Sequence, residues 1–256
     1  MLRQKFKDES YFVFFFIETI ERLKTGEEKL IKGKVASDMV KWFIKDQFNL
    51  HLRRTIASYT SGENLESVKE KLITTIYYMD KGWMPEVVLL NNRGKVYNQY
   101  AETYDEMLWI LSLGYLLDIE NDTFQKLVDF IDRDKVKDFL YEFIIQAKIK
   151  DRRIITEESW RKYFGIPWTF EKLRQVIKET EKESAEYLVK EFVSKEWYRR
   201  HKQYSWHDDH KYEICIYSGY WSFETAAVVK IMGLDDSSFI DCKYYPKDLV
   251  HQERSL

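Results

Sequence analysis

Three histidines and two aspartates lie close together in the last quarter of the chain, and their types could support chemistry. They are His201, His207, Asp208, Asp209 and His210. Imidazole combined with carboxylate is a ligand set that suits zinc or non-haem iron. The spacing matches no established zinc motif, and the helical H-E-x-x-H pattern is absent. We therefore favour a polar loop whose rings cap helix ends or pack against aromatic side chains, and we expect neither a metal nor a cofactor.

Glu224 is the second candidate, because it lies in a segment, Tyr220–Met232, that is nearly all apolar. An ionised carboxylate in such a helix is costly unless it is paired or hydrogen-bonded. Lys230 cannot be its partner within the helix, where neighbouring side chains are three or four residues apart. We expect a partner from elsewhere in the chain, such as a His, Tyr or Arg side chain, within a structural hydrogen-bond network.

The chain carries none of the common nucleotide-binding or acyl-transfer motifs. The G-x-S-x-G nucleophile elbow, the P-loop and the G-x-G-x-x-G fingerprint are all absent. Cys215 lies between two isoleucines, which is typical of an unreactive core thiol. The enzymatic alternative that remains is a metal-dependent hydrolase. Its site would be built from His201, His207, His210 and Glu224.

Acidic residues precede and follow the apolar segment that contains Glu224. If they converge in the folded chain, they form an acidic surface that could meet a basic partner, with charge complementarity setting the association rate and the specificity. The residues of this candidate partner-binding surface are Asp208, Asp209, Glu213, Glu224, Asp235 and Asp236. A structural alternative exists for the last two, because Gly233 can end one helix and an aspartate after it can cap another.

The composition favours a mostly helical, globular protein. Of 256 residues only 9 are glycine and 3 are proline, too few for the frequent turns of a β-sandwich or barrel. Hydrophobic residues make up 45% and charged residues 33%, so we expect a substantial core and no extended disorder. We predict an all-α fold, a compact multi-helix bundle. Its N-terminal helical region is 1–120 and its C-terminal helical region is 121–256.

The charge pattern and the N-terminus bear on partners and location. The 41 basic and 43 acidic side chains are mixed along the chain without the basic stripe of a nucleic-acid binder. The apolar run Tyr11–Ile17 is shorter than the roughly 20 residues that span a bilayer, and it lacks a signal-peptide cleavage site. We interpret it as part of a first core helix. With two cysteines in no metal-ligand spacing, we expect a cytoplasmic protein without direct nucleic-acid or membrane contact.

Hydrophobic periodicity and capping residues place the helices. Gly26 is interpreted as the end of the first helix, and Asn64 and Asp134 as N-caps of later ones. Asn91–Gly94 has the composition of a turn. The segment 101–118 is apolar on nearly every face, which indicates a central helix. The predicted helices are 10–24, 35–59, 65–81, 101–118, 122–131, 135–150, 169–201 (one helix or two in line) and 220–232.

Three stretches of the C-terminal region combine aromatic, small and acidic residues in a distinctive order. Tyr217–Ala227 reads YSGYWSFETAA, Gly233–Asp236 reads GLDD, and Tyr244–Leu249 reads YYPKDL. In these stretches the chain resembles the PoNi family, the immunity proteins that accompany PoNe-type DNase toxins in bacterial polymorphic toxin and type VI secretion systems. The family often carries another aromatic residue where Lys247 stands. Most of the motif residues have the character of core, so they identify the family without assigning the toxin contacts.

The resemblance implies a function without chemistry. A PoNi protein would bind its cognate nuclease toxin stoichiometrically in the cytoplasm, where the toxin's substrate, chromosomal DNA, lies. A DNase site holds phosphates and tends to be electropositive, so an acidic surface could occupy it. The alternatives are the metal-dependent hydrolase and a helical scaffold for some other protein partner. The identity of the toxin, its contact residues and the oligomeric state are left open by the sequence.

Overall fold

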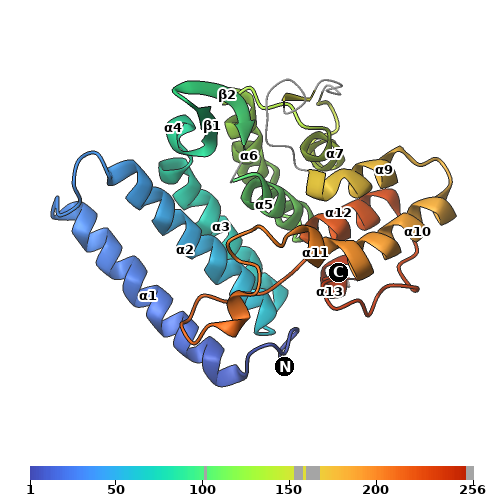
Figure 1. Cartoon of the computed structure of the whole chain (residues 1–256), viewed down its shortest axis with the longest axis horizontal. Coiled ribbons are helices and arrows are strands. Elements are labelled where there is room, and N and C mark those ends of the chain that lie inside the picture. Colours follow the sequence, from blue (N-terminus) through green and yellow to red (C-terminus); the bar gives the residue numbers. More distant parts are fainter. Residues whose placement is uncertain (101–102, 153–157, 160–167, 252–256) are drawn as a thin grey trace. The chain divides into compact units, whose positions relative to one another are not determined.

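The computed structural model describes residues 1–100, 103–152, 158–159 and 168–251, and this part of the chain is built from helices with one two-stranded hairpin (Figure 1). The predicted all-α class is confirmed. The chain forms two compact units, the first from residues 1–88 and 205–219 and the second from residues 89–204 and 220–256. The chain therefore enters each unit twice. The sequence predicts two regions that meet near residue 120. That division follows the order of the chain and not the contacts in space, and it stays a prediction.

The first unit is a small group of packed helices. It contains α1 Glu9–Ile31, α2 Val40–Thr60, α3 Leu65–Gly82 and the short α4 Pro85–Val88. Helices α2 and α3 pack closely against each other, and α1 lies against α2. Apolar side chains recur on the inward faces at helical spacing. The buried set includes Phe12, Phe15, Phe48, Ile56, Tyr59, Val68, Leu72, Ile76 and Met79.

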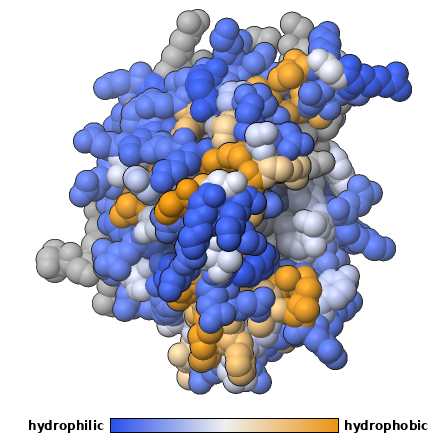
Figure 2. Space-filling view, turned by 90° about the vertical axis from the view of Figure 1, so that its left-hand side faces the viewer, coloured by the Kyte–Doolittle hydropathy of each residue, from blue (hydrophilic) through white to orange (hydrophobic). Residues whose placement is uncertain are grey.

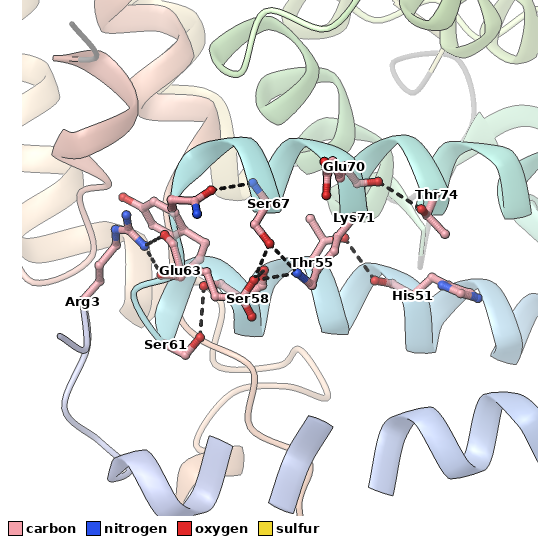
Figure 3. Close-up of polar contacts among 12 residues, drawn as sticks. Arg3, His51, Thr55, Ser58, Ser61, Glu63, Ser67, Glu70, Lys71 and Thr74 are labelled. Carbon is pink, nitrogen blue, oxygen red and sulfur yellow. Dashed lines mark hydrogen bonds and ion pairs between the residues drawn. The ribbon is translucent and has the colours of Figure 1, made fainter. Parts of the chain in front are cut away.

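The connection between α2 and α3 is held by polar contacts around Glu63 (Figure 3). Oε2 of Glu63 accepts hydrogen bonds from Lys71 Nζ at 2.6 Å and Ser67 Oγ at 2.8 Å. Burial raises the pKa of the Glu63 carboxyl, but these hydrogen bonds outweigh burial and hold the pKa below its ordinary value. The Asn64 side chain accepts from the backbone N–H of Ser67 at 2.8 Å, which confirms it as the N-cap of α3.

The sequence predicts that Gly26 ends the first helix. This prediction is wrong, because α1 continues to Ile31. The glycine is buried where α1 meets α2, and a Cβ atom at this position would lie 2.1 Å from Oε1 of Gln47. Its missing side chain therefore makes room for the neighbouring helix. A glycine that allows a close approach and a glycine that ends a helix look alike in sequence.

The second unit is larger and has the most apolar helix at its centre. It contains β1 Leu89–Asn92, β2 Lys95–Tyr100, α5 Tyr104–Leu116, α6 Asn121–Arg133, α7 Phe139–Lys148, α9 Glu171–Lys178, α10 Lys182–Glu191, α11 Trp197–Arg200, α12 Phe223–Met232 and α13 Lys247–Val250. Helix α5 is buried on nearly every face, as predicted, and it packs against α7 and α12. Gly233 ends α12 with φ of 60°, as also predicted. No helix in the described residues is both long and apolar enough to cross a membrane.

The hairpin is an addition to the prediction, which placed only a turn at Asn91–Gly94. Strands β1 and β2 pair antiparallel through Asn92 and Lys95. Arg93 and Gly94 between them both have positive φ, 52° and 81°. Turns with two residues of positive φ match the twist of the flanking strands. The residues of the turn predict it correctly, but the two strands beside it are too short and too polar to be predicted from the sequence.

The predicted helical stretch 169–201 is divided. Helices α9 and α10 lie side by side, joined through the extended backbone of Glu179 (Figure 1). After α10 the chain widens into a π-helical turn, η2 Phe192–Glu196, which continues into α11. The prediction of one helix or two in line is therefore wrong, because α9 packs beside α10 and α10 continues through η2 into α11. The residues that join α9 to α10 are Glu179, Thr180 and Glu181, and acidic or polar residues of this kind do not indicate that the chain reverses direction.

Helix α7 begins one turn later than predicted. Asp138, and not Asp134, is its N-cap, since its side chain accepts from the backbone N–H groups at the start of the helix. Asp134 instead lies at the end of α6, where Tyr100 OH donates to its Oδ2 at 2.6 Å and Arg133 Nε to its Oδ1 at 2.7 Å. Two aspartates four residues apart give the same capping signal, and long-range partners decide between them.

Candidate functional site

The three histidines singled out by sequence belong to two different units. His201, in the second unit, is fully buried, with Nδ1 2.6 Å from the carbonyl oxygen of Trp197. His207 and His210 belong to the first unit, where the ring of His210 packs against Phe6 with a centroid distance of 4.4 Å. Among the described residues, no group of three or more His, Cys, Asp or Glu side chains is placed to hold a metal ion. The hydrolase alternative therefore has no metal site in that part of the chain.

Glu224 is fully buried at the start of α12 and takes part in a hydrogen-bond network. Its Oε1 accepts from Trp197 Nε1 and from Ser222 Oγ, each at 2.6 Å. The predicted partner from elsewhere in the chain is confirmed, but it is the indole of Trp197 and not a His, Tyr or Arg side chain. Oε2 has no hydrogen-bond partner within the described residues. Burial raises the pKa of Glu224 to about 7, although the hydrogen bonds from Ser222 and Trp197 act in the opposite direction.

Three of the six acidic candidates for partner contact are buried. They are Asp209, Glu224 and Asp236. Oδ2 of Asp236 accepts from Tyr245 OH at 2.9 Å, so this carboxylate stabilises the turn that follows α12. A side chain enclosed in this way presents no carboxylate to a partner in this conformation.

The other three acidic candidates reach solvent but belong to different units. Asp208 and Glu213 lie on residues 205–219 of the first unit, and Asp235 follows α12 in the second. Asp208 Oδ2 pairs with Lys211 Nζ at 2.7 Å. The backbone N–H of Ser237 donates to Asp235 at 2.9 Å, and a turn follows, so the predicted helix cap at this position is wrong. Convergence of all six residues into one acidic surface stays a prediction.

We call residues 205–219 the returning segment. The start of the YSGYWSFETAA motif joins this segment by hydrogen bonds to residues 1–88 of the same unit. Tyr11 OH donates to the carbonyl oxygen of Tyr217 at 2.8 Å, and Thr60 Oγ1 donates to that of Ser218 at 2.6 Å. Tyr217 OH donates in turn to Gln4 Oε1 at 2.8 Å. Tyr217 is fully buried, so the motif begins as a structural anchor, in agreement with its core-like character.

The returning segment also runs beside the N-terminal half of α1. Lys7 Nζ donates to the carbonyl oxygen of Tyr212 at 3.0 Å. Burial and a hydrogen bond to the Glu18 carboxylate raise the pKa of the Cys215 thiol, which keeps it a poor nucleophile. Between these two contacts, Ile214 is 63% exposed. The segment therefore presents an apolar side chain next to α1.

The outward face of α1 carries a feature that sequence analysis missed. Val13, Phe14, Ile17 and Ile20 are between 48% and 64% exposed, whereas Phe12 and Phe15 are buried. Figure 2, which looks at the side of the molecule where Figure 1 draws α1, shows apolar groups among hydrophilic ones. The signal was present, because the run Tyr11–Ile17 has more apolar residues than one buried helix face requires.

Comparison with known proteins accounts for almost the whole chain. Residues 3–129 match the family model described as PoNe immunity protein (PoNi), N-terminal, and residues 136–249 match that of PoNe immunity proteins (PoNi), C-terminal. Among solved structures, the crystal structure of Protein PA2201 from Pseudomonas aeruginosa has a similar fold, with a TM-score of 0.64. Sequence identity to that protein is 16%, and the match covers 97% of this chain and 89% of that chain. No curated protein matched the chain.

Proposed function

The chain belongs to the PoNe immunity protein (PoNi) family, and on this premise we propose that it neutralises its cognate PoNe toxin by binding it stoichiometrically. The family implies a non-enzymatic inhibitor and a cognate PoNe toxin as the partner. The observation that carries the proposal is the match of both family models, one to each half of the chain. The proposed setting is a bacterial polymorphic toxin system, with toxin delivery by type VI secretion and protection in the cytoplasm.

Binding alone is sufficient for inhibition of a nuclease. A DNase must hold the phosphates of its substrate, so its site is lined by basic side chains and attracts acidic surfaces. The exposed carboxylates of Glu213 in the first unit and Asp235 in the second, with the partly exposed Asp208, support a contact of this kind. The net charge of the chain is only −2, so attraction would come from local acidic patches and not from the charge of the whole protein.

A titration of nuclease activity tests the proposal. The probe is the nuclease domain of a PoNe-type toxin sought in the gene next to that of this chain, acting on linear duplex DNA. Activity is expected to fall linearly with added immunity protein and to vanish at a fixed molar ratio, as tight stoichiometric binding requires. Inactivation by trace amounts would indicate an enzyme that modifies the toxin. Absence of both binding and protection would rule out neutralisation of this nuclease.

Charge reversal at the returning segment is expected to slow association. Asp208→Lys with Glu213→Lys should reduce the association rate constant about tenfold at low ionic strength and leave dissociation nearly unchanged, because exposed charges act mainly on encounter. The control is Glu66→Lys with Glu70→Lys, which makes the same change in net charge at two exposed positions of α3. Stopped-flow binding at low and high salt measures the association and dissociation rate constants of the two variants. Equal slowing in the two variants would attribute the effect to net charge and not to this surface.

A further inference from the structure

Four large apolar side chains form a continuous stripe on the outward face of α1. Ile17 lies four residues after Val13, three after Phe14 and three before Ile20, so it is the neighbour of all three on the helix surface. Each is about half exposed or more. A surface helix ordinarily places polar residues on this face. A contiguous exposed apolar patch of this kind marks an interaction site.

The stripe has an acidic border. The charged residues of α1 from Glu9 to Glu21 are the exposed Glu9, Glu18 and Glu21, whereas the exposed Arg22 and Lys24 follow at the C-terminal end of the stripe. The returning segment, which is bonded next to this half of the helix, adds the exposed Ile214 and Glu213. The surface therefore combines apolar side chains at its centre with carboxylates around them.

This combination fits a partner that presents an apolar patch bordered by basic side chains. We propose that the outward face of α1 is the docking surface for the cognate toxin, an inference that rests on the proposed function. The basic side chains with which a DNase holds phosphates would face Glu18 and Glu21, while an apolar group of the toxin covers the stripe. The apolar contacts supply most of the affinity, and the charges set the orientation and the association rate.

Two other occupants fit this face less well. In a twofold dimer the same patch on two copies meets itself, so one acidic border would lie against another. A helix that binds a membrane surface carries Lys and Arg beside its apolar face to meet anionic lipids. Here Glu9, Glu18 and Glu21 lie along the stripe, and the basic Arg22 and Lys24 stand at its C-terminal end. Charge complementarity therefore favours a basic protein partner.

The test replaces two stripe residues, Phe14→Ser with Ile17→Ser, and measures the Kd for the toxin. Both side chains are exposed, so circular dichroism and the melting temperature are expected to stay near those of the parent chain. The matched control is Ile73→Ser with Tyr77→Ser, which removes one aliphatic and one aromatic side chain from the exposed face of α3. The probe is the neighbouring-gene nuclease with its catalytic residue substituted. The stripe variant should raise the Kd at least about thirtyfold, mainly through faster dissociation, and the control by less than about threefold.

The possible outcomes separate this inference from the proposed function. An unchanged Kd in the stripe variant, with tight binding by the parent chain, would overturn the docking surface and leave the proposed function standing. A parent chain that neither binds nor inhibits the nuclease would overturn both. Light scattering on the chain alone provides a further check, because a dimer that the stripe substitutions convert to monomers would assign the face to a second copy.

A second variant keeps the inference testable if the stripe variant fails to fold. Glu18→Lys with Glu21→Lys preserves the apolar side chains and reverses the border. It is expected to reduce the association rate with the nuclease about tenfold at low salt and to have a smaller effect at high salt. An association rate equal to that of the parent chain would contradict the proposed contact between this border and a basic rim.

Discussion

Replacing Asp138 with alanine is expected to lower the free energy of unfolding by about 3–5 kcal/mol, because it removes the nearer of the two carboxylates that face a buried guanidinium. The side chains of Arg174 and Asp138 are each 1% exposed, and Nη2 of Arg174 lies 2.8 Å from Oδ2 of Asp138. The same carboxylate accepts from Tyr104 OH at 3.1 Å. It also caps α7 by accepting from the backbone N–H groups of Leu140 and Tyr141. One substitution removes all of these contacts.

Unfolding by guanidinium chloride at pH 7 measures the loss in free energy of unfolding. Tyr104 OH, 2.7 Å from Arg174 Nη2, and Glu158 Oε1, 3.8 Å from Arg174 Nε, stay beside the guanidinium, but neither replaces the charge-assisted hydrogen bond to Asp138. The control is Glu191→Ala, which removes an exposed ion pair with Lys195 and should cost less than about 0.5 kcal/mol. Adding Arg174→Met to Asp138→Ala should recover part of the stability, because the buried guanidinium that lost Asp138 is removed as well. A loss below about 1 kcal/mol in the single variant would mean that water or Glu158 compensates the guanidinium.

Where local signals agree with one another, the sequence determines the fold well. The apolar character of α5 on all faces predicts its central position, and Asn64 and Gly233 mark real helix ends. Where the decision depends on distant residues, the same signals mislead. Gly26 accommodates Gln47 of the next helix, and Tyr100, which is 34 residues away, takes the carboxylate of Asp134 away from capping. Periodicity and capping preferences describe neighbours along the chain and not across it.

The candidate site was less predictable than the fold, for a related reason. Sequence identifies carboxylates but not their exposure, and Asp209 and Asp236 are enclosed where Asp208 and Asp235 reach solvent. The return of residues 205–219 to the first unit is also invisible in a single sequence, because it depends on contacts such as that of Tyr11 with Tyr217. The family resemblance rests on residues that are mostly buried, so it identified the family correctly without indicating a surface.

Glu224→Gln is expected to change how stability depends on pH. In the folded chain burial raises the pKa of Glu224 from 4.5 to about 7. Below pH 4.5 the carboxyl is protonated in both the folded and unfolded states, so it adds no pH dependence. Between pH 4.5 and about 7 only the unfolded state ionises, and stability falls as the pH rises. At about 1.4 kcal/mol per pKa unit, the loss reaches roughly 3 kcal/mol and levels off above pH 7.

Glutamine removes this slope and keeps the acceptor. Its amide oxygen can still accept the hydrogen bonds from Trp197 Nε1 and Ser222 Oγ, while it never ionises. The difference in free energy of unfolding, variant minus parent, should therefore rise by roughly 3 kcal/mol between pH 4.5 and 7 and stay constant above. Guanidinium denaturation at one-unit intervals measures it. Other titrating groups are common to both proteins and cancel in the difference.

Glu63→Gln provides a control of opposite sign. The pKa of Glu63 is held below its ordinary value because the hydrogen bonds from Lys71 and Ser67 outweigh burial. Its contribution to stability is therefore present above pH 4.5 and is lost as the pH falls through the lower folded value. That variant should show no slope between pH 4.5 and 7. A flat difference for Glu224→Gln in the same window would mean that the buried carboxyl ionises as readily as one in water. The slope together with unchanged toxin binding would assign Glu224 to the structural network of α12 and not to the interface.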